Sequence, residues 1–183
     1  MKNTPILAFI LCISLLLTAC GGGGSDSEII PSEGANVGAT LANDEWEVKL
    51  VDPPYKSKEV GEGTEVTGRA SEFGDIGTYI ADGAFLVVPV ELTNKAGEML
   101  MLGGKLFKVV DGAGNEYAMS PRPVHASVIW TSDVWTDKAN QLPSNPMGAG
   151  ITNPGPLVFD VAEDATGLQL TMDGIDGSIE LGF

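Results

Sequence analysis

Few side chains in this sequence could carry out nucleophilic catalysis. His125 is the only histidine, so it is the only imidazole that could act as the general base of a serine hydrolase. Ser120, Ser127 and Ser132 lie near it in the sequence, but none stands in the Gly-x-Ser-x-Gly motif that frames such a nucleophile. A lone histidine is more often a loop or packing residue than a catalytic base. We therefore expect a protein that is not an enzyme, with no catalytic residues and no cofactor.

Carboxylate groups are numerous and could bind a hard cation. Asp160, Glu163 and Asp164 follow an expected strand, and Asp173 and Asp176 stand beside glycines further along the chain. Calcium takes about six to eight oxygen ligands, and neither group has the spacing of a known calcium loop. Aspartate and glycine also form turns, which is the simpler interpretation. We expect no metal site here, and calcium binding stays an alternative.

Thioether groups suggest a second metal, copper. Five methionines lie outside the N-terminal apolar segment: Met99, Met101, Met119, Met147 and Met172. Thioethers are soft ligands that select copper(I), but methionine is also an ordinary filler of hydrophobic cores. The chain has neither a His-x-Met pair nor a second histidine. We expect these methionines to pack in the core and keep copper binding as an alternative.

The segment over residues 120–150 is the main candidate for a binding surface. It contains Trp130 and Trp135, which are two of the three tryptophans, together with His125 and Arg122. Connections of about this length are uncommon inside a compact domain and are often functional. The tryptophans could bind a glycan, a peptide or a partner protein. Alternatively they close one end of the fold, because large aromatic side chains are usually buried.

The N-terminus has the pattern of a bacterial lipoprotein signal. Lys2 precedes an apolar run over residues 6–17, which is shorter than the roughly 20 apolar residues of a membrane-spanning helix. The sequence Leu-Thr-Ala-Cys that ends at Cys20 resembles a lipobox, in which the cysteine is lipidated. Residues 1–19 are therefore expected to be a signal peptide. The lipid on Cys20 would hold the protein outside the cytoplasm, on the cell membrane or on an outer membrane.

Composition divides the rest of the chain into a tether and one domain. Residues 20–40 are rich in glycine, serine and proline, and we expect a flexible tether with a typical reach of about 25 Å. Residues 41–183 are long enough for one ordinary domain. Cys12 leaves with the signal and Cys20 is lipidated, so the domain has no disulfide and no cysteine metal site.

The charge of the chain excludes one class of partner. There are 25 acidic and 10 basic residues, giving a formal net charge of −15. A nucleic-acid partner is excluded because phosphate binding requires clusters of lysine and arginine. The acidic surface keeps the protein soluble and repels anionic lipid head groups. The partners that remain are the membrane, through Cys20, and an envelope protein or a glycan.

The elements that would position these residues are short strands. Residues 46–50 alternate between apolar and polar, and residues 84–93 have apolar side chains on both faces at first. Pro89 places the second strand at an edge or beside a bulge. Residues 106–110 and 115–119 flank Asp-Gly-Ala-Gly and predict a hairpin. Residues 58–78 are rich in glycine and glutamate and predict a loop or a weak edge hairpin. Further strands are expected at residues 157–161, 168–172 and 179–183.

Regularly spaced short strands without a helical pattern predict an all-β fold, an immunoglobulin-like antiparallel β-sandwich. Three segments also resemble a known family: residues 85–94, which end in Thr-Asn, residues 107–117, which contain Val-Val-Asp-Gly-Ala-Gly-Asn-Glu-Tyr, and residues 155–161, Gly-Pro-Leu-Val-Phe-Asp-Val. The family is the telokin-like domain of unknown function of bacterial secreted lipoproteins, related in fold to a mycobacterial immunoprotective extracellular antigen. Pro89 and the long segment after residue 119 depart from its pattern.

The resemblance implies an exported, often lipid-anchored immunoglobulin-like sandwich without an established activity, and it supplies no catalytic residues. We therefore expect a lipid-anchored extracytoplasmic binding or interaction module. The alternatives are an envelope-associated enzyme and a calcium or copper protein.

Overall fold

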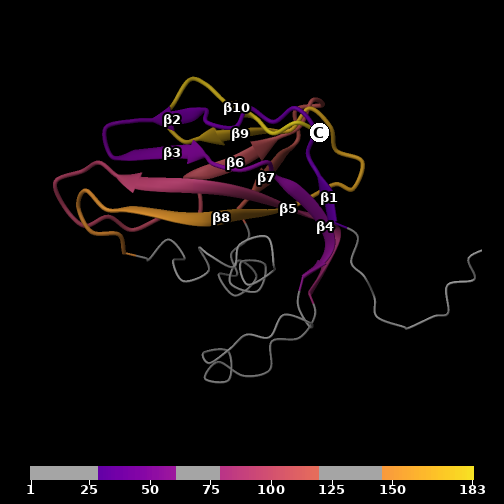
Figure 1. Ribbon diagram of the computed structural model, residues 1–183, viewed down its shortest axis with the longest axis horizontal. Coiled ribbons are helices and arrows are strands. Elements are labelled where there is room, and N and C mark those ends of the chain that lie inside the picture. Colours follow the sequence, from indigo (N-terminus) through magenta and orange to yellow (C-terminus); the bar gives the residue numbers. More distant parts are fainter. Residues whose placement is uncertain (1–28, 61–78, 120–145) are drawn as a thin grey trace, which may run out of the picture.

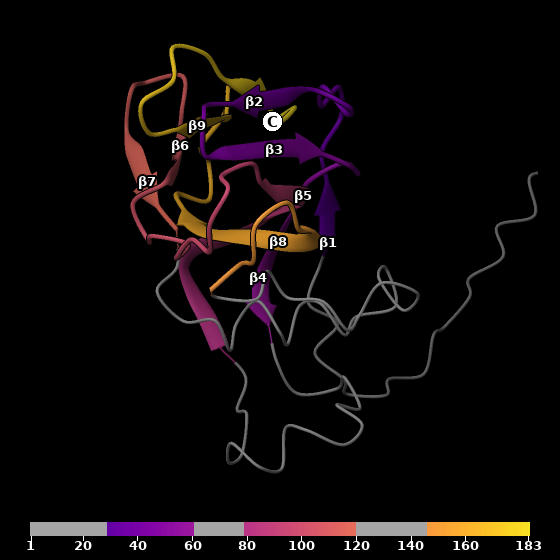
Figure 2. The same cartoon turned by 90° about the vertical axis from the view of Figure 1, so that its left-hand side faces the viewer.

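The structure, a computed structural model, describes residues 29–60, 79–119 and 146–183, with the side chains of residues 59, 60 and 79 left out. Every regular element in these ranges is a strand, and the strands are numbered β1 to β10. Within the same ranges the chain forms no apolar helix long enough to cross a membrane. The strands form two sheets that lie face to face (Figures 1 and 2).

The larger sheet has six strands, in the order β1-β4-β5-β3-β2, and β8 pairs with β5. All of its pairings are antiparallel. Its strands are β1 (Ile29–Pro31), β2 (Thr40–Ala42), β3 (Trp46–Leu50), β4 (Tyr55–Val60), β5 (Tyr79–Asn94) and β8 (Thr152–Val161). β5 is the central strand, because β3 and β4 follow one another along one side and β8 runs along the other.

The smaller sheet has four strands, in the order β10-β9-β6-β7. They are β6 (Phe107–Val110), β7 (Glu116–Ala118), β9 (Gln169–Met172) and β10 (Ile179–Glu180). The hairpin of β6 and β7 confirms the prediction made from Asp-Gly-Ala-Gly, and the strand at residues 46–50 is confirmed as well. The two antiparallel sheets confirm the expected all-β sandwich.

The core lies between the sheets and follows from the alternation along β5. Leu86, Val88, Val90 and Leu92 are fully buried and face the smaller sheet. The partner side chains from that sheet include Phe107, Val109, Leu170 and Met172. A second apolar cluster lies on the opposite face of the larger sheet and consists of Tyr55, Ala81, Phe85, Val87 and Val158. The two clusters together explain why β5 is apolar at every position from residue 84 to residue 90.

Its lack of an N–H group led us to expect Pro89 at a sheet edge or beside a bulge. It lies at neither, because the pairing of β5 with β8 continues unbroken on both sides of it. It lies in the central strand, opposite Pro156 of β8. On its other side the neighbouring chain passes from β3 to β4, because the pairing changes from Leu50↔Val90 to Tyr55↔Val87. The Pro89 carbonyl accepts the N–H of Val51 at 3.0 Å. The nitrogen of Pro89 points to the place where β3 ends and β4 has not yet begun. No backbone donor is required there, so the sheet tolerates proline.

The expected tether also differs from the structure. β1 pairs with β4, and the N–H of Ser32 donates to the carbonyl of Pro54 at 2.8 Å. Ala35 and Ala39 pack against the core. The folded domain therefore begins by Ile29 and not at residue 41. The composition of residues 20–40 concealed this because the attachment depends on the backbone pairing of β1 and on two small alanine side chains.

Candidate functional site

The residues proposed from the sequence as a binding surface lie outside the described residues, and so does the lipidation site. They are Arg122, His125, Trp130 and Trp135, together with Cys20. Their roles stay predictions. The site must therefore be sought among the described residues, where two surfaces stand out at opposite ends of the sandwich.

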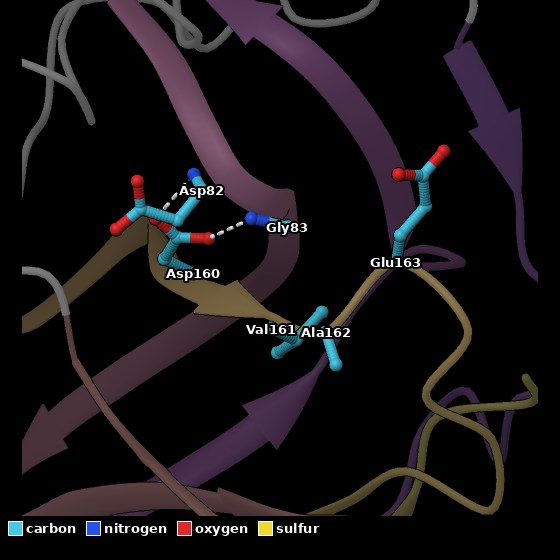
Figure 3. A pocket seen from close by; sticks show the side chains of 6 residues that line it. All are labelled: Asp82, Gly83, Asp160, Val161, Ala162 and Glu163. Carbon is cyan, nitrogen blue, oxygen red and sulfur yellow. Dashed lines mark hydrogen bonds between the residues drawn. The ribbon is translucent and has the colours of Figure 1, made fainter.

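The first surface is a shallow hollow of about 490 Å³ between β5 and β8 (Figure 3). It is lined by Asp82, Gly83, Asp160, Val161, Ala162 and Glu163. Figure 3 shows Asp82 and Asp160 together on one side and Glu163 apart from them, on the turn that follows β8. The hollow is wide open to solvent and excludes little water. It is unlike the enclosed, largely apolar pockets that bind small molecules.

The carboxylate of Asp160 completes the backbone pairing at this hollow. The ladder between β5 and β8 ends at the pair Ala84↔Val161. Beyond it, Asp160 Oδ1 accepts the N–H of Gly83 at 3.2 Å, and Oδ2 accepts the N–H of Asp82 at 3.1 Å. Asp160 thus satisfies two backbone donors that no strand partner reaches, which is a structural role.

The other charges around the hollow are exposed. Lys58 Nζ donates to Glu163 Oε2 at 3.0 Å and to the carbonyl of Gly83 at 2.6 Å. The side chains of Lys58 and Glu163 are 44% and 76% exposed, so solvent screens this ion pair. No three His, Cys, Asp or Glu side chains of the described part of the chain are arranged to hold a metal ion.

The second surface lies at the end of β5 and is organised by Asn94, which is completely buried. Its Nδ2 donates to the carbonyls of Glu98 and Met147, both at 2.9 Å. Its Oδ1 accepts the N–H of Ala96 at 2.9 Å. Its backbone bonds to Gly150 and Ile151. One side chain therefore fixes two loops that are about 50 residues apart in the sequence. We call these loops, residues 95–106 and 146–151, the distal end.

The distal end exposes large apolar side chains. Leu100 and Met147 form a two-bond bridge, with N···O distances of 3.0 and 2.9 Å. Leu100 packs against the core, so its neighbours Met99 and Met101 point outward. They are 65% and 68% exposed, and Ile151 on the other loop is 46% exposed. Both loops are held by the same buried asparagine.

The five methionines considered as copper ligands are not brought together. Met147 and Met172 are buried in the core, and Met119 packs against it. Met99 and Met101 lie on the surface of the distal end. The expectation that all five fill the core is therefore wrong for these last two, because the Leu100 bridge turns them outward.

The opposite end of the sandwich, where β5 begins, has its own buried polar residue, Asp111. Its carboxylate accepts hydrogen bonds from the N–H groups of Ala113 and Asn115, the Asn115 side-chain amide and the Tyr117 hydroxyl, at 2.8–2.9 Å. These hydrogen bonds lower the pKa of Asp111 from 3.8 to about 2, and the bond from the Asn115 side-chain amide has the largest effect. Gly114 adopts a φ of +88°, as the turn requires.

A buried lysine near this end was missed by sequence reasoning. Lys56 is 7% exposed, and its Nζ donates to the carbonyl of Ala165 at 2.7 Å. The ammonium lies 4.8 Å from the ring centroid of Phe183. Burial lowers the pKa of Lys56, and the charge of Asp164 partly opposes this. Lys56 therefore fastens the C-terminal segment to β4.

The turn roles of Asn94 and Asp111 could be predicted from local sequence, whereas the role of Lys56 could not. Both acceptors stand at the start of expected turns, where Asn and Asp side chains commonly bond the N–H two residues on. No sequence pattern shows that the Asn94 amide also reaches Met147, or that Lys56 finds a carbonyl 109 residues away.

Comparison with known proteins does not identify a function for these residues. No family model matches the chain, and no curated protein matches it. A solved structure that aligns with it is the 2.2 Å crystal structure of a conserved hypothetical protein from Bacillus anthracis, with a TM-score of 0.49 and 16% sequence identity. The alignment covers 83% of this chain and 98% of that chain. A functional proposal must therefore rest on the residues themselves.

Proposed function

We propose that this protein is a lipid-anchored extracytoplasmic interaction module that presents its distal end to a partner protein. The observation that supports this most is the exposure of Met99, Met101 and Ile151 on loops that a buried asparagine holds in place. Anchoring through Cys20 is supported by the Leu-Thr-Ala-Cys sequence.

The position of the distal end suits a partner beyond the membrane surface. The chain enters the sheet at Ile29, which lies opposite Ser57 and, across β4, at the level of Phe85. Asn94 lies nine residues further along β5, which corresponds to about 30 Å. Figure 1 shows β1 near one end of the sandwich and the tip of β5 at the other. A protein anchored near β1 would direct the distal end away from the lipid.

The chemistry of the distal end suits a protein better than a small ligand. Exposed methionines adapt to irregular apolar surfaces because their side chains are unbranched and polarisable. Loops that are already ordered lose little conformational entropy on binding. The surface also lacks the enclosed, mostly apolar shape that small-molecule sites have.

The other expectations remain predictions. The absence of enzyme activity is supported by the open shape of the hollow, where Asp160 bonds to the backbone and Glu163 to Lys58. A glycan or protein surface around Trp130 and Trp135 would lie outside the described residues. Membership of the telokin-like family rests on the three quoted segments.

The proposal can be tested by photo-crosslinking in cells. A photoreactive residue replaces Ile151 in one variant and Thr166, an exposed residue at the other end, in a second. We expect a discrete protein adduct from position 151 and none from position 166. Adding Met99→Ser and Met101→Ser to the first variant should abolish the adduct. The same adduct from both positions, or one that survives the methionine substitutions, would contradict the proposal.

A separate measurement tests the anchor. Mass spectrometry of the mature protein is expected to find acyl chains on Cys20, and Cys20→Ser should release the protein from the membrane fraction. An unmodified Cys20 in the mature chain would refute lipid anchoring, whatever the crosslinking shows.

A further inference from the structure

The edge strand β1 is unusually apolar for its position. Its three residues, Ile29, Ile30 and Pro31, are all exposed, and Ile29 and Ile30 are 48% and 50% exposed. Among the described strands β1 pairs with β4 only. Exposed edge strands usually have charged side chains or other features that prevent association. β1 has two such features, its short length and Pro31, but Ile29 and Ile30 still expose apolar surface. Contact with another apolar surface would remove these side chains from water.

A third isoleucine lies close to this strand. Ile80, at the start of β5, is 67% exposed. It pairs with Glu59 of β4, two residues after Ser57, which pairs with Ile29. β4 thus separates Ile29 from Ile80 by the width of one strand. Ile29 and Ile30 point to opposite faces of the sheet because they are successive residues of a strand, so both flank its free edge. The three isoleucines lie at the end of the larger sheet where the chain enters, and we call them the entry patch.

The length of the preceding chain limits what can cover the entry patch. Ile29 follows Cys20 by nine residues. Nine residues span at most about 30 Å when fully extended. If Cys20 is lipidated, as the proposed function holds, β1 is the strand that is kept nearest to the bilayer. The distal end lies about 30 Å further along β5.

From these observations we propose that the entry patch rests in the head-group region of the membrane that holds Cys20. This inference depends on the proposed lipid anchor. The tether keeps lipid at a high effective concentration beside Ile29 and Ile30, whereas a protein partner would have to compete for the same space. Contact with lipid removes the isoleucine side chains from water, which is favourable.

The negative charge of the protein determines which lipid head groups the entry patch can contact. The chain has a formal net charge of −15, and Asp82 is exposed two residues after Ile80. Anionic lipid head groups repel a surface of this kind, and salt screens the repulsion. The entry patch should therefore contact zwitterionic phosphatidylcholine more closely than a bilayer rich in phosphatidylserine at low ionic strength.

The test uses the lipidated full-length protein on vesicles. Both cysteines of the sequence are used, Cys12 in the signal and Cys20 in the anchor, so Ile30→Cys supplies one free thiol for a polarity-sensitive NBD dye. Ile151→Cys is the matched control, because Ile30 and Ile151 are 50% and 46% exposed. Both labelled proteins are bound to phosphatidylcholine vesicles through the same lipid.

We expect the dye at position 30 to become several-fold brighter on the vesicles and to be quenched by a spin-labelled lipid. The dye at position 151 should change little. Ile29→Ser with Ile80→Ser should reduce the signal at position 30, and phosphatidylserine at low salt should reduce it further. Thermal unfolding of each labelled variant shows whether it is folded.

The outcomes separate this inference from the proposed function. A protein that carries no lipid and does not float with the vesicles would refute the anchor. A protein that floats, but whose dye at position 30 behaves like the dye at position 151, would overturn the entry patch and leave the anchor intact. A dye at position 30 that is shielded in cells but not on vesicles would also overturn it, in favour of a protein partner.

Discussion

The two ends of the sandwich are each organised by one buried polar side chain, but the two side chains differ in reach and in charge. Asn94 at the distal end joins residues on two loops, the farthest of them 53 residues away. Asp111 at the opposite end bonds only to residues two to six positions further along. Asn94 is neutral, whereas Asp111 carries a charge. The comparison shows that Asn94 acts through long-range contacts, whereas Asp111 organises a local turn.

This difference has a direct consequence for stability. If Asn94 is lost, both distal loops lose their common support, and three backbone groups each lose a hydrogen bond. If Asp111 is lost, one hairpin loosens. Acid should therefore affect the two ends differently, since only one of them depends on an ionised group.

The largest effect is expected for Asn94→Ala. Two carbonyls and one N–H would each lose a hydrogen bond to a fully buried side chain, which should lower the free energy of unfolding by about 3 kcal/mol. Urea unfolding measures the loss, and hydrogen exchange should increase at Leu100 and Met147. Asn36→Ala, at an exposed position, is the control and should change stability by less than about 0.5 kcal/mol. Equal effects of the two changes would contradict the role given to Asn94.

A smaller loss is expected for Gly83→Ala, at the end where Asp111 lies. A Cβ atom there would overlap the carbonyl of Val161, which is backbone and cannot rotate away. The strands would have to separate locally, at a cost of about 2 kcal/mol. Thermal unfolding checks this result. Gly97→Ala has open space around it and should be neutral, so a similar loss at both glycines would show that the close approach is unimportant.

The pH dependence should separate Asp111 from Asn94. The pKa of Asp111 is lowered to about 2 in the folded protein, below its value in the unfolded chain. The ionised carboxylate therefore stabilises the fold above about pH 4, and this stabilisation is lost as the pH falls through about 2.

Asp111→Asn removes the titrating group, so its deficit relative to the wild type should shrink from pH 4 to pH 2. The deficit of Asn94→Ala should stay constant over the same range. Urea midpoints at several pH values check both expectations. A deficit of Asp111→Asn that does not vary with pH would show that the carboxylate charge is unimportant.

The smallest effect on stability is expected for Met99→Ser with Met101→Ser. Both side chains are mostly exposed, so the change in the free energy of unfolding should stay within about 0.5 kcal/mol. Partner binding should nevertheless be lost. A large loss of stability would mean that these methionines hold the distal end together rather than present it.

Local patterns in the chain were sufficient for some elements. The alternation in β3, the hairpin of β6 and β7 and the turn after Asn94 were all predicted correctly, because each depends on residues close together in the sequence. Other features could not be predicted. Pro89 is tolerated in a central strand only because β3 gives way to β4 beside it, and β1 joins the sheet only through its pairing with β4.

The sequence by itself determined the all-β class, because alternating side chains and glycine turns constrain the backbone over a few residues. It also determined the acidic surface, and it carries the signal from which we infer lipidation at Cys20. The tertiary structure alone decided which polar groups are buried and which methionines face outward. Those properties depend on partners such as Met147 for Asn94 and Ala165 for Lys56. Such partners come together only when the two sheets pack, and no local pattern records them.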